Sequence, residues 1–454
     1  MSGVIGIYSQ TNQQVCDDLY YGLYALQHRG QLSCGIAVND NGFIDYHKGL
    51  GIIPDVFTSA DLKVLRGNIA LGHVHYSNTV DSQSKMNISP VVVGYKRGTL
   101  AIAGDGSIVN YKRLRAELED QGMVFQSELD TEVLAILMAK YHKLDLDDAF
   151  VETLKRLVGA YAIVMMTPDC IVAARDPHGI KPLTLGRLGD DYIVASESCA
   201  IETLGGTFVR DIAPGEVIRI DKNGLTSKIL RQEKRALCMF ELVYLARPDS
   251  IIDSKSVYLA RVEVGKQLYR ENPIKDVDIV IGAPDSGIAA AIGYAQESGI
   301  PYAEGLVKNR YIGRTFIEPT QSNREHGVKI KLNPLRENVK GKRIVLVDDS
   351  IVRGTTIKHT IEMLKQAGAQ SVHIRIASPP VKYSCHLGVD MHTEEQLISH
   401  QKSTEEIREM IGADSLYFIT VEGISKATDK SNGFCKGCFT RNYPVERDDY
   451  ETNL

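Results

Sequence analysis

Two adjacent carboxylates, Asp348 and Asp349, follow an apolar run at residues 343–347 and precede a short polar turn. The turn, from Ser350 to Thr356, leads into a helical pattern, so backbone N–H groups and a helix N-terminus are expected to surround an anion there. The carboxylates suit what lies beside a phosphate, namely sugar hydroxyls and a hard cation such as Mg²⁺. The segment therefore predicts a site for a ligand that carries phosphate, ribose and magnesium-bound pyrophosphate. An ordinary strand followed by a capped helix would explain the apolar run but not the paired aspartates.

Two other segments are expected to meet this turn. The loop Ala283–Gly287 follows its own apolar run and offers small polar side chains. Residues 308–315 form a cationic, glycine-containing stretch, and Arg324 and Lys331 follow it. Such a stretch could close over a polyanion, neutralise it and exclude water. The alternative is a solvated basic loop, which is how most charge runs behave.

The C-terminal half must position these segments. From about residue 257 strand patterns alternate with helical ones, which predicts a parallel sheet, with strands at 277–282, 343–347 and 372–376. Residues 355–368 predict an amphipathic helix closed by glycine. Ligands of open parallel sheets bind beyond the carboxyl ends of the strands, where Asp348 and Asp349 lie.

Capping-box spacing predicts the start of two later helices, at Thr393 with Gln396 and at Ser403 with Glu406. The first 230 residues read instead as short strands and hairpins with a few helices. We expect strands at 69–73, 100–103, 161–166 and 217–220, a helix at 130–138, and a linker marked by the charged junction 231–235.

Composition limits the classes of protein. A chain of 454 residues suggests two or three domains, and 43% hydrophobic with 24% charged residues is typical of a globular protein. The net charge of -5 gives no basic footprint for nucleic acid. We expect no signal peptide and no membrane span, and hence a cytoplasmic protein. Eight cysteines then indicate thiols or a metal site rather than disulfides.

The turn at 348–356 resembles the phosphoribosyl pyrophosphate (PRPP) loop of type I phosphoribosyltransferases. Together with Phe240–Ser250, Pro284–Gly287 and Lys308–Phe316, it makes nearly the whole chain similar to the glutamine PRPP amidotransferase family, whose members form 5-phosphoribosylamine in purine synthesis. The resemblance implies an N-terminal-nucleophile αββα sandwich followed by a type I phosphoribosyltransferase domain. It divides the chain into a glutaminase-like domain at 2–230, a linker at 231–256, a transferase domain at 257–425 and a C-terminal segment at 426–454.

The resemblance also implies roles for individual residues. Ser286, Asp348 and Asp349 would hold Mg²⁺. The 5-phosphate would lie against residues 350–356, which include Ser350, Arg353, Gly354, Thr355 and Thr356. Pyrophosphate would contact Lys308, Arg310 and Arg314.

Cys435 and Cys438 form a C-x-x-C pair that could be a zinc half-site, a redox pair or part of a cluster. The residues alone do not identify its partners. The resemblance supplies Cys238 and Cys385, because one branch of the family binds a [4Fe–4S] cluster at these positions. Tetrahedral zinc would accept the same four thiolates.

The glutaminase-like half departs from the family pattern at three positions. The family's N-terminal cysteine nucleophile uses its own α-amino group as base, but Met1 removal would here expose Ser2. His75 stands where the family has an arginine for the glutamine carboxylate. The oxyanion turn reads Asp105-Gly106-Ser107 instead of Asn-Gly-Asn, so a carboxylate would face developing negative charge. Asp130 keeps the position that binds a substrate amino group.

We therefore expect a PRPP-dependent transferase with weak or absent glutaminase activity, which uses ammonia or another amine. One alternative is the ordinary glutamine-dependent enzyme, with Ser2 as a working or engineered nucleophile. Another is a non-catalytic PRPP or nucleotide sensor. A homo-oligomer and feedback by purine nucleotides are implied only by the resemblance.

Overall fold

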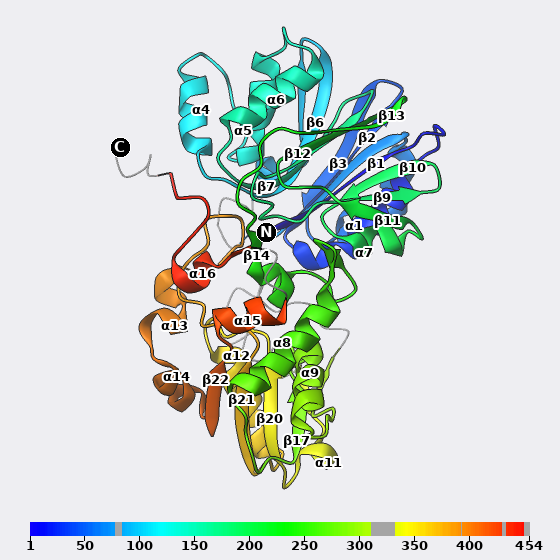
Figure 1. Ribbon diagram of the computed structural model, residues 1–454. Helices are drawn as coiled ribbons and strands as arrows, with labels where there is room; N and C mark the ends of the chain where they lie inside the picture. The colour runs from blue at the N-terminus through cyan, green and yellow to red at the C-terminus, as the bar shows by residue number, and fades with distance from the viewer. Residues whose placement is uncertain (78–83, 310–331, 392, 429–432, 449–454) are drawn as a thin grey trace.

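The computed structural model describes residues 1–77, 84–309, 332–391, 393–428 and 433–448. The chain forms two lobes, with the N-terminal half above and the C-terminal half below in Figure 1. The N-terminus lies where the lobes meet. There β14 (Leu237–Cys238) pairs in parallel with β23 (Phe434–Cys435), so a segment from the end of the chain is fastened to the connection between the lobes. None of the helices in the described ranges is both long and apolar enough to span a membrane.

The first layer of the upper lobe is an antiparallel seven-stranded sheet. Its order is β11 (Thr207–Asp211), β9 (Thr184–Leu188), β10 (Asp191–Ala195), β1 (Ser2–Tyr8), β4 (Ile69–His75), β2 (Ser33–Asp40) and β3 (Phe43–Leu50). Successive β1 side chains point to opposite faces. Ile5 and Ile7 pack with the helices α1 (Cys16–Ala25) and α7 (Ser198–Thr203), whereas Val4 and Tyr8 pack toward the second sheet.

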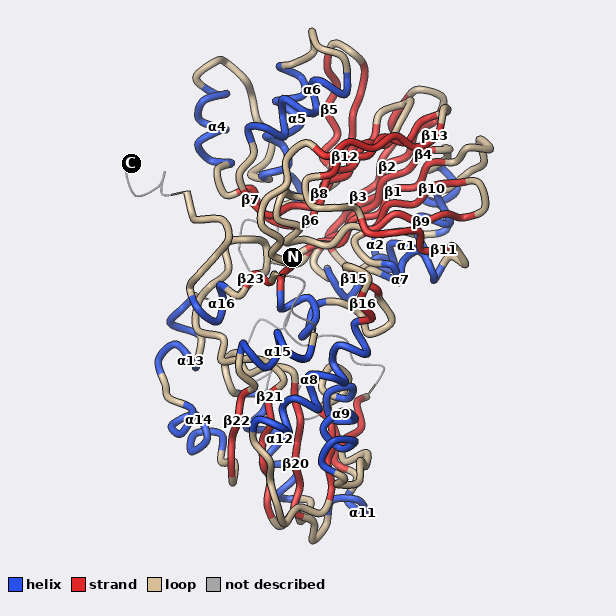
Figure 2. The backbone as a smooth tube through the Cα atoms, in the orientation of Figure 1, coloured by secondary structure: helices blue, strands red, loops and turns tan. Residues whose placement is uncertain are grey.

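The second layer is an antiparallel six-stranded sheet. Its order is β13 (Gly224–Ile229), β12 (Glu216–Asp221), β8 (Ile171–Arg175), β7 (Gly159–Met166), β6 (Gly98–Ile108) and β5 (Val91–Tyr95). Helices α4 (Tyr111–Glu119), α5 (Asp130–Lys140) and α6 (Leu146–Arg156) cover its outer face (Figure 2). Two sheets between two layers of helices confirm the predicted αββα sandwich, and the four expected strands fall in β4, β6, β7 and β12.

The lower lobe contains the predicted parallel sheet, in the order β17 (Ile279–Gly282), β20 (Arg343–Asp348), β21 (Ser371–Ile376) and β22 (Ser415–Phe418). Val345 and Val347 of β20 pack with α8 (Val257–Glu271), α9 (Ile288–Ser298) and α15 (Val421–Ala427). Ile344 and Leu346 pack on the other face with α12 (Thr355–Gln366) and α14 (Thr404–Ile411). Strands buried on both faces explain the continuous apolar runs of the sequence.

One of the two predicted capping boxes is wrong. Ser403 and Glu406 form the reciprocal bonds that begin α14. Thr393 instead precedes the short 3₁₀ helix η6 (Glu394–Gln396) and makes no side-chain cap bond. The reason is that the side chain of Gln396 accepts a hydrogen bond from Arg353 and does not reach back to the N-cap.

The remaining elements are short. They are η1 (Gln27–Arg29), α2 (Ile53–Val56), α3 (Ser59–Val64), η3 (Lys85–Asn87), the π-helical η4 (Glu241–Leu245), β15 (Ile251–Ile252), β16 (Lys255–Ser256), β18 (Leu306–Lys308), β19 (Leu332–Pro334), α11 (Arg336–Val339), α13 (Ile398–Gln401) and α16 (Gly437–Thr440).

Candidate active site

The turn after β20 has the predicted strand–turn–helix geometry. Asp348 is the last residue of the strand, and Gly354 adopts a φ of 81°, a left-handed conformation that glycine reaches without steric cost. Helix α12 begins at the next residue, Thr355, and the first N–H groups of a helix have no partners within it. Thr355 and Thr356 are exposed, and Ser350 is half-buried. The turn therefore presents hydroxyls and a helix N-terminus to an incoming anion.

The paired carboxylates lie at the carboxyl edge of the parallel sheet. Asp349 accepts hydrogen bonds from the hydroxyls of Ser286 and Ser350, and its own N–H donates to Asp348 Oδ1 at 2.8 Å. Burial, and then repulsion by Asp349, hold the pKa of Asp348 well above its usual range. Burial also raises the pKa of Asp349. A divalent cation would relieve this repulsion, so Ser286, Asp348 and Asp349 fit the Mg²⁺ site that the sequence implies.

The loop between β17 and α9 reaches the same edge. Gly287 makes this approach feasible, because a Cβ there would lie 2.5 Å from the carbonyl oxygen of Val347. Asp285 on this loop pairs with Lys308, the last residue of β18, which brings one predicted pyrophosphate ligand to the site. The other two, Arg310 and Arg314, lie outside the described residues, as do Arg324 and Lys331.

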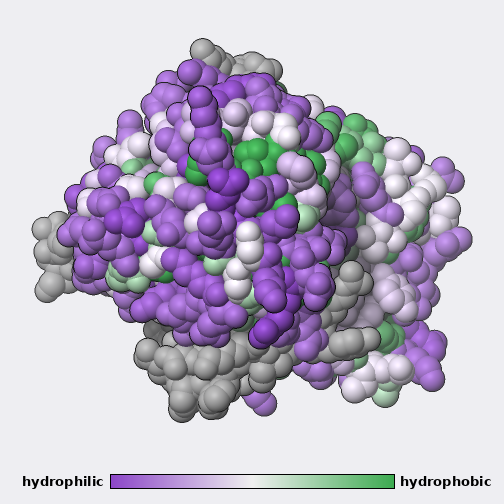
Figure 3. Space-filling view, turned by 90° about the horizontal axis from the view of Figure 1, so that it is seen from below, coloured by the Kyte–Doolittle hydropathy of each residue, from purple (hydrophilic) through white to green (hydrophobic). Residues whose placement is uncertain are grey.

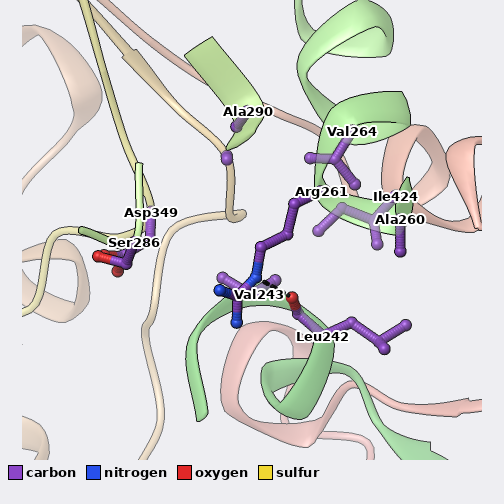
Figure 4. Close-up of a pocket in the computed structure, with 10 residues that line it drawn as sticks. Leu242, Val243, Ala260, Arg261, Val264, Ser286, Ala290, Asp349 and Ile424 are labelled. Atoms are coloured by element: carbon purple, nitrogen blue, oxygen red, sulfur yellow. Dashed lines mark hydrogen bonds between the residues drawn. The ribbon is translucent and has the colours of Figure 1, made fainter. Parts of the chain in front are cut away.

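Asp349 and Ser286 line one side of a small pocket (Figure 4). Arg261 of α8 crosses it and donates to the carbonyl oxygens of Leu242 and Ala246, each at 2.8 Å. These carbonyls belong to the segment around η4, the single π-helix of the described chain. The rest of the lining is mostly apolar: Leu242, Val243, Ala260, Val264, Ala290, Ala377 and Ile424.

The predicted glutaminase pocket brings Ser2, His75 and Asp105 together at the junction of the lobes. Ser2 Oγ lies 2.8 Å from His75 Nδ1. The N–H of Ser2 donates to Asp105 Oδ1 at 2.7 Å. The carbonyl of Ser2 accepts from Arg29 Nε at 2.8 Å. The segment carrying Arg29 can approach β4 only because Gly30 has no Cβ, which would lie 2.3 Å from the backbone nitrogen of His75.

Asp105 is a buried, ionised carboxylate between two cations. Arg29 lies 2.9 Å from it and Lys181 lies 3.3 Å from it, and all three side chains are fully buried. Burial alone raises the pKa of Asp105, but Lys181 and Arg29 outweigh burial and hold that pKa below its usual range. Both cations are therefore committed to acidic partners within the protein.

Residues 105–107, expected from the resemblance to form a turn, lie instead within β6 and pair with β7, and the lobes touch at Gly106. Gly106 has a φ of 126°, and Gly388 of the lower lobe packs so closely that a Cβ on it would lie 2.4 Å from the carbonyl carbon of Gly106. Lys181 Nζ donates to Gly388 O at 3.1 Å. Asp130, at the start of α5, accepts from the N–H of Ile108 at 2.9 Å, and burial raises its pKa. Residues of both lobes therefore surround Asp105 and Lys181.

The four predicted cluster cysteines lie near one another but do not form a metal site. Cys238 and Cys435 are register partners in β14 and β23, Cys438 lies in α16, and Cys385 follows β21. Burial, followed by the other three thiols, holds the pKa of Cys438 well above its usual range. Within the described ranges, however, no three His, Cys, Asp or Glu side chains converge well enough to bind a metal ion.

Sequence reasoning missed Lys181 and Glu197. Glu197 is fully buried and pairs with Arg29 at 2.6 Å and with His28 at 2.7 Å. Neither residue stands in a motif that predicts a charged group in the core. A run such as Asp176–Pro182 gives no sign of a fully buried lysine, because burial of Lys181 depends on Asp105, far away in the sequence.

Two domain families match this chain. A glutamine amidotransferase domain matches residues 77–203, and a phosphoribosyl transferase domain matches residues 256–379. The chain is 49% identical to the amidophosphoribosyltransferase of Archaeoglobus fulgidus over 451 residues, which are 98% of each chain. It is 45% identical to that of Bacillus subtilis, over 98% of this chain and 94% of the relative.

Solved structures agree with these relatives. The B. subtilis glutamine PRPP amidotransferase complexed with ADP and GMP superimposes with a TM-score of 0.91 and 44% identity, covering 99% of this chain and 98% of that one. A structure described as the allosteric regulatory enzyme of purine biosynthesis gives a TM-score of 0.92 with 44% identity, covering 99% of this chain and 97% of that one. The likeness therefore extends over both lobes.

Proposed function

The chain belongs to the amidophosphoribosyltransferase family, and we propose that it transfers the 5-phosphoribosyl group of PRPP to a nitrogen donor, releasing pyrophosphate and 5-phosphoribosylamine. It is a phosphoribosyltransferase, of the glycosyltransferase class, and its family acts in purine synthesis. This membership favours an enzyme over the sensor considered above.

The observation that carries the proposal is the pair of buried carboxylates at the end of β20. Asp348 and Asp349 have raised pKa values, share the site with Ser286, and stand beside the open N-terminus of α12. We assign the phosphate to the turn, from Ser350 to Thr356, and the ribose hydroxyls and metal to the carboxylates. Bound Mg²⁺ would supply positive charge that neutralises pyrophosphate.

Pyrophosphate leaves C1 of the ribose through a cation-like transition state, so the protein mainly orients the donor and stabilises the departing charge. We assign the second task to Lys308, together with Arg310 and Arg314. Lys308 forms an ion pair with Asp285 in this structure. Pyrophosphate would have to displace Asp285 and become the partner of the Lys308 ammonium.

The comparisons favour glutamine as the nitrogen donor, as in the ordinary enzyme of the family. The amidotransferase domain matches the upper lobe, and the full-length relatives cover both halves of the chain. In this reaction, glutamine hydrolysed in the upper lobe would supply ammonia to the lower one. The close contact of Gly388 with Gly106 supports direct cooperation between the lobes.

A specific observation favours free ammonia, or another amine, as a second candidate. Asp105 stands in the position of an oxyanion donor and is ionised, so it would repel the charge that develops on an amide oxygen. Loss of one oxyanion donor typically lowers the rate about 10²- to 10³-fold. His75 also lacks the fixed charge of an arginine for the α-carboxylate of glutamine, because burial lowers its pKa well below the usual value.

We propose a structural [4Fe–4S] cluster, or zinc, at Cys238, Cys385, Cys435 and Cys438. The support is the chemistry of the donor set: four thiols with no disulfide, of which Cys238, Cys435 and Cys438 are buried with raised pKa values, so that their thiolates are disfavoured until a metal is bound. A bound cluster or zinc ion would fasten the C-terminal segment to the connection between the lobes.

Purine nucleotides are proposed as regulators, since one similar structure holds ADP and GMP. The homo-oligomer and the cytoplasmic location stay predictions.

A donor comparison tests the proposal. The protein, prepared anaerobically, is incubated with PRPP, Mg²⁺ and either ammonium or glutamine, and pyrophosphate release is measured. Equal release with both donors supports the ordinary enzyme. Release with ammonium but little with glutamine supports the second candidate, and no release with any amine contradicts the transferase itself.

A further inference from the structure

A cavity of about 250 Å³ lies at the carboxyl edge of the parallel sheet, beside its outer strand β22. It is reached just past the last residues of β21 and β22, Ile376 and Phe418. Ligands of open parallel sheets bind outside this edge. None of the residues that line the cavity also lines the pocket beside Asp349, so the two are separate sites.

Ring-bearing side chains make up half of the cavity wall. Two of them follow β21, two end β22 and one lies in α16: Pro379, Pro380, Tyr417, Phe418 and Phe439. Elsewhere, the face of the molecule seen from below is mostly hydrophilic, apart from limited apolar areas (Figure 3). Aromatic faces pack well against another flat ring. The wall therefore favours a flat, ring-containing ligand over a flexible chain.

The volume of the cavity limits the size of that ligand. An engineered apolar cavity of roughly 150 Å³ is large enough to bind benzene. Drug-sized ligands occupy pockets of about 300 to 1,000 Å³. A cavity of about 250 Å³ therefore has room for one ring and a small substituent, but does not enclose the base, ribose and phosphate of a nucleotide.

Charge at the cavity decides the substituent. Lys382 is the one charged residue in its wall, and this exposed side chain forms no ion pair within the part of the chain that the structure describes. On the side of Tyr417 and Thr420, the carboxylate of Glu271 accepts hydrogen bonds from both hydroxyls, at 3.2 and 2.8 Å. An acid group that pointed to that side would be repelled by Glu271. At Lys382 it would meet an ammonium instead.

We propose that this cavity binds a small aromatic carboxylate, with its ring against the proline and aromatic side chains and its carboxylate at Lys382. The ring supplies apolar contact area, and the single cation fixes which end of the ligand faces the solvent. The inference goes beyond the transferase reaction and does not require PRPP to be the substrate of the lower lobe.

The chain connects this cavity to the transferase site over a short distance. The N–H of Ala377 donates to the carbonyl oxygen of Asp348 at 2.9 Å, and Ala377 lines the pocket beside Asp349. Pro379, two residues later, lines the second cavity. A ligand that packs against Pro379 would therefore contact the same segment that borders the paired carboxylates.

Ligand-observed fluorine NMR with 4-fluorobenzoate tests the site in the full-length protein. The fluorine resonance should broaden when wild-type protein is added, with the roughly millimolar affinity expected of so small a ligand. Benzoate should displace the probe. Acetate, which lacks the ring, should not displace it, and benzyl alcohol, which lacks the charge, should compete about 2- to 5-fold less well than benzoate, the usual contribution of an exposed ion pair.

Two variants, each with a matched control, locate the ligand. Thr404 is exposed and lines the cavity at the start of α14, so Thr404→Phe should fill the space and abolish binding, whereas Glu405→Phe, at the next exposed position and outside the lining, should not. Lys382→Gln should weaken binding about 2- to 5-fold. Lys426→Gln, an exposed residue of α15 outside the lining, should bind as the wild type does.

Folded wild-type protein that leaves the probe resonance sharp would overturn the site. Equal binding by the Thr404→Phe and Glu405→Phe variants would place the ligand elsewhere, and equal competition by benzyl alcohol and benzoate would refute the role of Lys382. Displacement by AMP or GMP but not by benzoate would refute the ligand class. If Thr404→Phe does not fold, the competition series on wild-type protein decides. Pyrophosphate release from PRPP with ammonium reports on the transferase alone, so the two failures can be told apart.

Discussion

The guanidinium of Arg29 faces the carboxylate of Glu241 through two hydrogen bonds, of 2.9 and 2.7 Å, and neither side chain is exposed to solvent. Arg29 belongs to the upper lobe, whereas Glu241 begins the π-helix η4 in the connection to the lower lobe. The carbonyl of Ala246, at the far end of that segment, accepts from Arg261, which lines the pocket beside Asp349. Polar contacts thus link Ser2 through Arg29 to Glu241 at the start of η4, and the end of η4 to Arg261, whose charge acts on Asp349.

Removing one partner of this pair should destabilise the protein strongly. Glu241→Gln leaves the charge of Arg29 buried with less compensation, and breaking such a pair typically costs about 3 to 5 kcal/mol. We expect urea unfolding to shift to markedly lower concentration. Glu297→Gln is the control, because its pair with Arg270 lies at the surface and should contribute little. Equal urea midpoints for the two variants would contradict the conclusion that the Arg29–Glu241 pair stabilises the folded protein.

The paired carboxylates should control turnover and not folding. Asp349→Asn removes a charge that we assign to the metal and ribose, so pyrophosphate release from PRPP should fall at least about 100-fold. Asp278→Asn is the matched control. Asp278 pairs with Arg343 at the opposite end of the same strands, and its variant should keep wild-type turnover. A similar rate of pyrophosphate release by both variants would show that Asp349 takes no part in the reaction.

Buried histidine should make the protein less stable in mild acid. Burial lowers the pKa of His73 from 6.5 to about 4, and its Nδ1 has no hydrogen-bond partner. Between these values the unfolded chain binds a proton that the folded chain does not, so the free energy of unfolding falls as pH drops from 6.5 toward 4. At about 1.4 kcal/mol per pKa unit, His73 accounts for roughly 3 kcal/mol of this loss.

His73→Gln should therefore lose less stability than the wild type between about pH 7 and about pH 5, measured by urea unfolding at each pH. Glutamine can still donate to Gly104 O, the partner of His73 Nε2 at 3.0 Å. Parallel curves for the two proteins would show that His73 is already protonated, or exposed, in the folded state.

The cysteine proposal predicts a specific metal content. Anaerobically purified protein should contain iron and labile sulfide, or zinc, and Cys438→Ser should lose it. Cys170→Ser serves as the control, because Cys170 is buried in the upper lobe and bonds to Thr167. Metal retained equally in both variants, or absent from all three proteins, would refute the proposed ligand set.

Much of the fold could be predicted from the sequence because its signals are local. The apolar run before Asp348, the short polar turn from Ser350 and the amphipathic pattern after it predict a strand, a turn and a helix, and these are present in β20, the turn to Gly354 and α12. The Ser403–Glu406 capping box is equally local. Thr393 was mispredicted because Gln396 has a tertiary partner, Arg353, that the spacing does not reveal.

The candidate site was predicted less completely, because its electrostatics depend on distant residues. The sequence indicated that a carboxylate at Asp105 would oppose an oxyanion, but not that Arg29 and Lys181 would pair with it and keep it ionised. It also gave no sign that His75 would contact Ser2 Oγ, since that contact follows from the pairing of β1 with β4. Such pairings join residues that lie far apart in the chain.

Titration calorimetry of the full-length protein with PRPP, in the presence and absence of Mg²⁺, tests the central claim most directly. We predict saturable binding of PRPP that requires Mg²⁺ and is lost when Asp348 and Asp349 are both replaced by asparagine. Folded wild-type protein that binds no PRPP with Mg²⁺ present, or a double variant that binds it as well as the wild type, would contradict the assignment.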